Sequence, residues 1–226
     1  MDCLDVLLRK SYEVLQILLD WFPDRDLVVA SIGAFFGAWF ATYFSGREKN
    51  KRIDSIRRSI YSDIQTICSQ HEGSLEHLLH FIRDPVFRNG DKLTICSLRP
   101  NDVSPMSHEL IALGSPLSDD QRRFIHVLPI LMDNVEGSYQ VISDHISTHA
   151  TDRIIAIPRR EIAKLIYEVV SLIHCAHSFC IDQEAYTHTA VGDSVAALEL
   201  ILGRLGVVDR ELIKAYSEAL PSFLSS

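Results

Sequence analysis

Apolar residues recur at helical spacing along most of this chain. After residue 52 they return every three or four positions, a period of about 3.6 residues that predicts a long amphipathic helix. The positions in this stripe are Ile53, Ile56, Ile60, Ile64, Ile67, His71, Leu75, Leu78 and Ile82. A period above about 3.5 favours packing in a bundle over a left-handed coiled coil. Because no proline lies between Pro23 and Pro85, one nearly continuous helix is expected up to about residue 82.

Four further helices are predicted after residue 117. The first begins after Ser118, where acidic residues fill the first turn, and the second begins after Pro158. Asp193 and Asp209 are expected to cap two shorter helices, with a turn marked by Gly203 and Gly206 between them. The residues expected to face inward on the two longer helices are Phe124, Leu128, Leu131, Val135, Tyr139, Ile142, Ile146, Ile162, Leu165, Ile166, Val169, Leu172 and Ile173.

Residues 83–117 lack this periodicity. They contain several prolines and turn-forming residues, so we predict a loop region with a short helix over residues 107–114. Residues 92–98 could form a strand, but the sequence offers no partner strand. The fold class is therefore all-α, and residues 118–226 form the remainder of a helical bundle that begins with the helix of residues 47–82.

Residues 27–44 form an apolar run without a charged residue or a proline. As a helix rising about 1.5 Å per residue, they would extend roughly 27 Å, close to the hydrocarbon thickness of a bilayer. The run accounts for much of the slightly positive mean hydropathy, +0.09. We predict one transmembrane helix at residues 27–46; the alternative is a buried core helix in a soluble protein.

The N-terminal segment, residues 1–26, is predicted to be an amphipathic helix. Charged residues interrupt its leucines too often for a second span, and Trp21 and Phe22 suit the depth of the lipid headgroups. The same pattern would fit a helix that packs on another protein. An acidic segment before the apolar run, with no small-residue cleavage site, does not resemble a signal peptide.

Basic residues are distributed unequally around the apolar run. Only Arg9, Lys10 and Arg25 precede it. The residues that follow it are Arg47, Lys49, Lys51, Arg52, Arg57 and Arg58. The positive-inside rule therefore predicts a cytoplasmic C-terminal domain and an N-terminus outside the cell membrane. We expect the six downstream residues to contact anionic lipid headgroups.

The rest of the chain is acidic, within a formal net charge of −8 for the whole protein. An acidic main domain argues against direct nucleic-acid binding. The five cysteines form no C-x-x-C pair, and four of them would lie on the cytoplasmic side. Thiols stay reduced there, so we expect buried or neutral thiols and not a disulfide framework.

Small residues occupy one stripe of the apolar run. Their positions are Ala30, Gly33, Ala34, Gly37, Ala38 and Ala41. At about 100° per residue they fall within an arc of roughly 140°, with Phe35, Phe36, Trp39 and Tyr43 opposite. Small residues allow two helix backbones to approach closely in lipid, so this stripe predicts self-association. The alternative is that glycine and alanine are simply common in membrane helices.

No catalytic motif is present, and no enzymatic activity or cofactor is expected. Glycine loops for phosphates, G-x-S-x-G and H-E-x-x-H are all absent from the sequence. His174, His177 and Cys180, spaced three apart, come nearest to a metal-binding set on one helical face. Such spacing arises easily in a chain with ten histidines, so no metal site is predicted.

These patterns together predict a single-pass membrane protein that forms a homo-oligomer. Its cytoplasmic domain would act as a scaffold, regulator or effector that binds an unidentified cytoplasmic protein. Two alternatives remain open from the sequence. One is an effector whose membrane helices assemble into a pore, and the other is a metal-dependent helical enzyme that uses His174 and His177.

Overall fold

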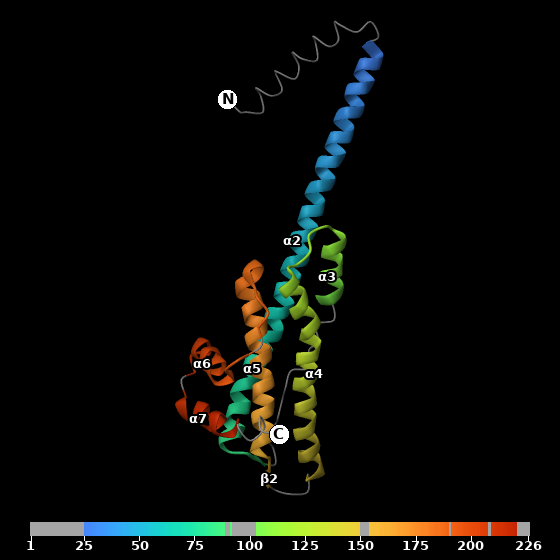
Figure 1. Ribbon diagram of the computed structural model, residues 1–226. Coiled ribbons are helices and arrows are strands. Elements are labelled where there is room, and N and C mark those ends of the chain that lie inside the picture. Colours follow the sequence, from blue (N-terminus) through green and yellow to red (C-terminus); the bar gives the residue numbers. More distant parts are fainter. Residues whose placement is uncertain are drawn as a thin grey trace. The chain divides into compact units, whose positions relative to one another are not determined.

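The computed structural model describes residues 25–88, 91, 103–149, 154–189, 191–207 and 209–220. These residues form a mostly helical protein with six α-helices, one short 3-10 helix and two short strands (Figure 1). The chain divides into two compact units, Met1–Asp54 and Ser55–Ser226. The amphipathic helix predicted for residues 1–26 lies outside the described residues, except for its last two positions.

Helix α2, Arg25–Arg83, is the long helix that the spacing predicted, and it begins in one unit and ends in the other. In the second unit its predicted stripe is buried, from Ile56 at 8% exposed to Ile82 at 0%. Ile53, the first position of the stripe, is only partly buried. His71 completes the stripe as a buried polar residue at 1% exposure, and its Nδ1 lies 2.9 Å from the carbonyl oxygen of Ile67.

Helix α4, Asp119–Thr148, begins at the predicted residue with a reciprocal cap. Ser118 Oγ accepts from the backbone N–H of Gln121, and Gln121 Oε1 accepts from the backbone N–H of Ser118, so two otherwise unpaired donors are satisfied. The predicted inward stripe is buried in part: Phe124, Leu128, Val135 and Ile142 are buried, whereas Leu131, Tyr139 and Ile146 remain partly exposed.

Helix α5, Arg159–Asp182, forms the centre of the core. All six residues predicted to face inward are at most 1% exposed, from Ile162 to Ile173. The helix packs against α4 along its length and also contacts α6, α7 and the 3-10 helix η1, Gln183–Ala185 (Figure 1).

The last two helices are capped as predicted. Asp193 and Asp209 accept hydrogen bonds from the first backbone N–H groups of α6, Ser194–Leu205, and α7, Arg210–Ala219. Gly206 ends α6 in the left-handed conformation, φ 73°, which glycine adopts without a side-chain clash. Gly203 lies within α6, so the turn begins later than predicted.

The loop predicted for residues 83–117 is wrong in part. Strand β1, Val86–Arg88, pairs antiparallel with β2, Ile154–Ala156, and Phe87 lies opposite Ile155. Helix α3, Val103–Ala112, begins four residues before the short helix expected here. Residues 92–98 lie outside the described part of the chain. The two strands were missed because three residues are too few for a visible alternation, and the partner strand follows α4.

Candidate functional site

The predicted membrane segment exposes its large side chains. Within the unit Met1–Asp54, every residue from 30 to 44 is exposed except Ile32, which is partly buried. Phe35 is 68% exposed, Phe44 58% and Trp39 53%. Contiguous apolar surface of this kind marks a surface that contacts a membrane or another protein.

Aromatic rings line this segment in pairs four residues apart. Trp39 stacks on Tyr43 with ring centroids 5.9 Å apart, and Phe40 stacks on Phe44 at 6.2 Å. At about 100° per residue, Phe44 falls inside the arc of the small residues and Phe40 about 20° beyond its edge. The aromatic side chains therefore lie not only opposite the small-residue stripe but also beside its C-terminal end.

The small-residue stripe itself is uncovered in the single chain. All six of its members are exposed: Ala30, Gly33, Ala34, Gly37, Ala38 and Ala41. A Cβ added at Gly33 or Gly37 would meet no heavy atom within 4 Å. The hydroxyl of Thr42 donates to the carbonyl oxygen of Ala38 at 2.8 Å, which satisfies this polar group within the helix.

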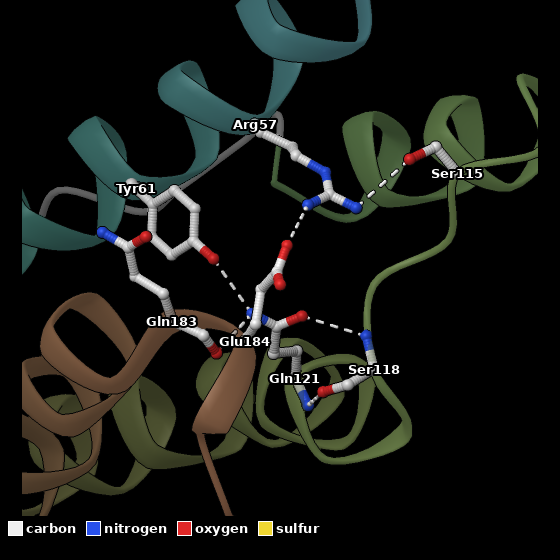
Figure 2. Close-up of polar contacts among 7 residues, drawn as sticks. All are labelled: Arg57, Tyr61, Ser115, Ser118, Gln121, Gln183 and Glu184. Atoms are coloured by element: carbon white, nitrogen blue, oxygen red, sulfur yellow. Dashed lines mark hydrogen bonds and ion pairs between the residues drawn. The ribbon is translucent and has the colours of Figure 1, made fainter.

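Arg57, one of the six downstream basic residues, contacts side chains of the helical bundle. Arg57 donates to Glu184 Oε1 at 3.2 Å and to Ser115 Oγ at 3.1 Å (Figure 2). Its side chain is 28% exposed. Arg57 therefore differs from Arg47, Lys49 and Lys51, which are exposed in the unit Met1–Asp54. All six residues were predicted to contact lipid headgroups, because their spacing in the sequence does not show which way the side chain of Arg57 points.

A buried glutamine joins three helices of the bundle. Gln121 is 3% exposed, and its Nε2 donates to Tyr61 OH at 2.9 Å and to the backbone oxygen of Gln183 at 2.8 Å (Figure 2). Burial raises the pKa of the Tyr61 phenol, which the bond to Gln121 partly opposes. The network fixes the start of α4 against α2 and the end of α5, so its role is structural. The sequence pattern Ser118-x-x-Gln121 is a capping signal, but it does not reveal the contacts to Tyr61 and Gln183.

Three cysteines are free in the described part of the chain, and burial keeps their thiols neutral. It raises the pKa of Cys68 to about 12 and that of Cys180 to about 11, and it also raises the pKa of Cys175. Cys68 and Cys175 are buried, as expected, whereas Cys180 is partly exposed. Cys3 and Cys96 lie outside the described residues.

The histidines of α5 are not joined into a metal centre. Burial lowers the pKa of His174 and His177, and the nearby Arg204 lowers both further. Cys180 is directed to α2, where its Sγ lies 3.7 Å from the backbone oxygen of Tyr61. Within the described ranges, no group of three or more His, Cys, Asp or Glu side chains could hold a metal ion.

Sequence reasoning missed a cavity between α4 and α5. It has a volume of about 200 Å³ and is lined by apolar side chains, among them Val127, Leu131 and Val191, and by polar ones that include Glu168 and His188. The one visible signal is Glu168 itself, an acidic residue inside the apolar run of α5. Its spacing of four residues from Lys164 is typical of an ion pair on a helix surface, so nothing in the sequence places Glu168 in a cavity.

One helix among the described residues is long and apolar enough to cross a membrane, judged by length and composition alone. It is Arg159–Ala185, which contains α5, and not the predicted run of residues 27–44; half of it is buried inside the fold. A core helix of a soluble bundle has the same composition. The side chains of residues 25–29, with which the run of residues 27–44 begins, lie outside those described.

Comparison with known proteins does not assign the chain to a family. No protein-family model, no curated protein and no solved structure matches it. The assignment of function therefore depends on the sequence and on the geometry described above.

Proposed function

We propose that this protein is a single-pass membrane protein that self-associates and presents a cytoplasmic interaction or regulatory domain. The observation that carries the proposal is the exposure of residues 30–44, where six large aromatic side chains between Phe35 and Phe44 are 42% to 68% exposed. By contrast, the apolar stripes of α5 and of the second half of α2 are buried in the bundle. Lipid chains would cover the exposed rings without requiring a partner protein.

The burial of α5, the other helix of membrane-spanning length, favours residues 27–44 as the span. If α5 crossed the membrane, the bundle would lose its central helix and expose the side chains that α5 covers on α4, α6 and α7. Residues 30–44 can enter a bilayer without breaking any core contact, since Ile32 alone among them is even partly buried.

The orientation follows from the charged residues that flank the run. Arg47, Lys49 and Lys51 are exposed directly after it and can remain with anionic headgroups on the cytoplasmic side. The bundle, Ser55–Ser226, would then lie in the cytoplasm. Exposed apolar side chains on α4, such as Ile130 at 57% and Val141 at 50%, provide contact points for a protein partner.

Self-association is proposed through the small-residue stripe of residues 30–41. The open space over Gly33 and Gly37 permits a second helix backbone to approach closely. Close packing in lipid gains dispersion energy along the whole contact, which substitutes for the hydrophobic effect between helices.

The experiment that tests anchoring and orientation uses the full chain with an epitope tag at each end. We expect the protein to stay with membranes after alkaline carbonate extraction. Protease added outside sealed cells should remove the N-terminal tag and spare the C-terminal tag. Release of the protein by carbonate would contradict the anchoring. Loss of the C-terminal tag alone would contradict the orientation.

A further inference from the structure

Two histidines lie side by side at the C-terminal end of α4. His145 is in the last turn of the helix and His149 caps it, so their spacing of four residues places them on one helical face. Their ring centroids are 4.6 Å apart. His145 is partly exposed and His149 is exposed, so solvent and ions can reach this end of the bundle. The pair therefore presents two neighbouring imidazoles at an accessible place.

Each ring is held by a hydrogen bond to a backbone carbonyl oxygen. His145 Nε2 lies 2.9 Å from the oxygen of Ala156 in β2, and His149 Nδ1 lies 2.9 Å from the oxygen of His145. A carbonyl oxygen can only accept, so both of these ring nitrogens carry a hydrogen and donate it. In the neutral imidazoles the other two nitrogens, His145 Nδ1 and His149 Nε2, are therefore unprotonated and each has a lone pair.

This hydrogen bonding is typical of histidines that bind metal ions. Such a histidine usually donates its second N–H to a backbone carbonyl, a carboxylate or water, which fixes the tautomer and the direction of the ring. Both His145 and His149 make this bond to a carbonyl. The bond from His145 also ties its ring to β2, which pairs with β1, so less side-chain freedom is lost when a ligand binds.

We propose that this pair chelates one divalent transition-metal ion, Cu²⁺ or Ni²⁺, through Nδ1 of His145 and Nε2 of His149. An ion about 2.0–2.1 Å from one nitrogen of each ring lies roughly 3.2 Å from each ring centroid, so the centroid separation of 4.6 Å corresponds to an angle of roughly 90° at the ion. Square-planar and tetragonal ions such as Cu²⁺ and Ni²⁺ have this angle between neighbouring ligands, whereas tetrahedral Zn²⁺ requires about 109°.

The number of ligands shows what kind of site this is. The described residues contain no set of three or more His, Cys, Asp or Glu side chains that could hold a metal ion, so water completes the coordination at His145 and His149. An ion held by two protein ligands and water exchanges with solvent. The site is therefore suited to reversible binding and not to a structural metal.

The test titrates the full-length protein in lipid nanodiscs with Cu²⁺, Ni²⁺ and Zn²⁺ in turn, at neutral pH and against a chelator of known affinity. We expect one site for Cu²⁺ or Ni²⁺ on each chain, and weaker binding of Zn²⁺. Electron spin-echo envelope modulation of the first equivalent of Cu²⁺ should detect two coordinated imidazoles. A single imidazole, or Zn²⁺ that binds as tightly as Ni²⁺, would contradict the proposal.

Three variants locate the ion. His149→Ala removes an exposed ligand and retains the bond from His145 to Ala156, so Cu²⁺ affinity should fall roughly tenfold or more and one imidazole should remain. An unchanged helical circular-dichroism signal shows that this variant is folded. His145→Ala with His149→Ala should remove both imidazoles from the spectrum. The control is His77→Ala with His80→Ala, two exposed histidines of α2, and it should leave affinity and spectrum unchanged. Equal Cu²⁺ affinity in wild type and His149→Ala, or a loss of the same size in the control, would refute the proposal.

Discussion

Residues 30–44 of α2 and helix α5 are both apolar and helical, but their side chains have opposite surroundings. In α5, residues such as Leu165, Ile166 and Val169 are fully buried in the bundle. In residues 30–44 the aromatic side chains are largely exposed. Apolar composition alone therefore does not distinguish a core helix from a candidate membrane helix. What distinguishes these two segments is burial, because half of the helix Arg159–Ala185 is covered by the fold.

The kinds of residue in the two segments also differ. Helix α5 carries branched aliphatic residues on its buried side and charged residues such as Arg160, Glu161 and Lys164 near its start. Residues 30–44 have no charged residue at all and combine aromatic rings with glycine and alanine. An amphipathic distribution suits the boundary between core and water, whereas an uncharged surface on all sides suits lipid.

Truncation of a buried ring should have the largest effect. Phe179 of α5 is 0% exposed, and its ring centroid lies 5.1 Å from that of Phe124 and 5.4 Å from that of Tyr186. Phe179→Ala should lower the free energy of unfolding of the bundle by about 3–5 kcal/mol, because it removes buried apolar surface and leaves a cavity. Urea unfolding with pulse proteolysis in nanodiscs measures the change.

The matched variant is Phe35→Ala in the exposed segment. Because Phe35 is 68% exposed, its truncation should change the free energy of unfolding of the bundle by no more than about 0.5 kcal/mol. An equal loss in both variants would mean that residues 30–44 are part of the folding core, and the comparison between the two segments would fail.

A charge in the middle of the apolar run should have the next largest effect. Gly37→Arg places a guanidinium at the centre of the proposed span, which costs about 2.5–3.5 kcal/mol of insertion free energy. The fraction of protein in carbonate-washed membranes should fall accordingly. Gly137→Arg is the control, because Gly137 is an exposed helical glycine of α4 with equally open space around it. Equal membrane fractions for the two variants would contradict insertion of this segment.

The small-residue stripe predicts an effect on association that leaves insertion intact. Gly33→Leu with Gly37→Leu adds bulk where two backbones would meet, so crosslinked oligomers in membranes should decrease several-fold. Phe35→Leu with Phe36→Leu changes the opposite side and should leave the oligomer yield unchanged. If all three proteins give the same yield at equal expression, association does not use this stripe.

Much of the helical bundle could be predicted from the sequence, because its signals are local. Ser118, Asp193 and Asp209 cap helices at the positions expected, and the spacing of isoleucines marks the buried face of α2. These features depend on residues within a few positions of one another, which spacing reports directly.

The missed features depend on residues far apart in the chain. Strand β1 pairs with β2, which follows α4 in the sequence. The side chain of Gln121 on α4 donates a hydrogen bond to Tyr61 on α2. The cavity at Glu168 depends on how α4 and α5 pack, and the direction of Arg57 depends on Ser115 and Glu184. Spacing along the chain contains no information about such contacts, because tertiary packing determines them.

The end of α5 should become more stable with a glycine. Gln183 has φ 45° and ψ −110°, a left-handed conformation that strains a residue with a Cβ. Only its backbone oxygen accepts the bond from Gln121, so Gln183→Gly keeps that bond and should raise the free energy of unfolding by about 1 kcal/mol. Gln140→Gly, in the interior of α4, should lower it by about 1 kcal/mol. A loss of stability in Gln183→Gly would show that its side chain contributes more than the strain costs.

The smallest effect concerns pH and the buried half of α2. Burial lowers the pKa of His71 from its ordinary value of 6.5, so the unfolded chain binds a proton more readily than the folded one. Its contribution to stability is therefore present above the ordinary pKa of 6.5 and is lost as the pH falls from that value through the lower pKa of the folded state. Glu168 acts in the opposite sense, because burial raises its pKa, and its protonation in the folded state offsets part of this loss.

His71→Leu should reduce the difference in unfolding free energy between pH 7 and pH 5.5. The exposed His77 on the same helix provides the control His77→Leu, which should leave that difference unchanged. The slope should not vanish in His71→Leu, because burial also lowers the pKa of His174, His177 and His188. Identical slopes in wild type and His71→Leu would show that His71 is hydrated in solution and that this part of α2 is less tightly packed than its 1% exposure indicates.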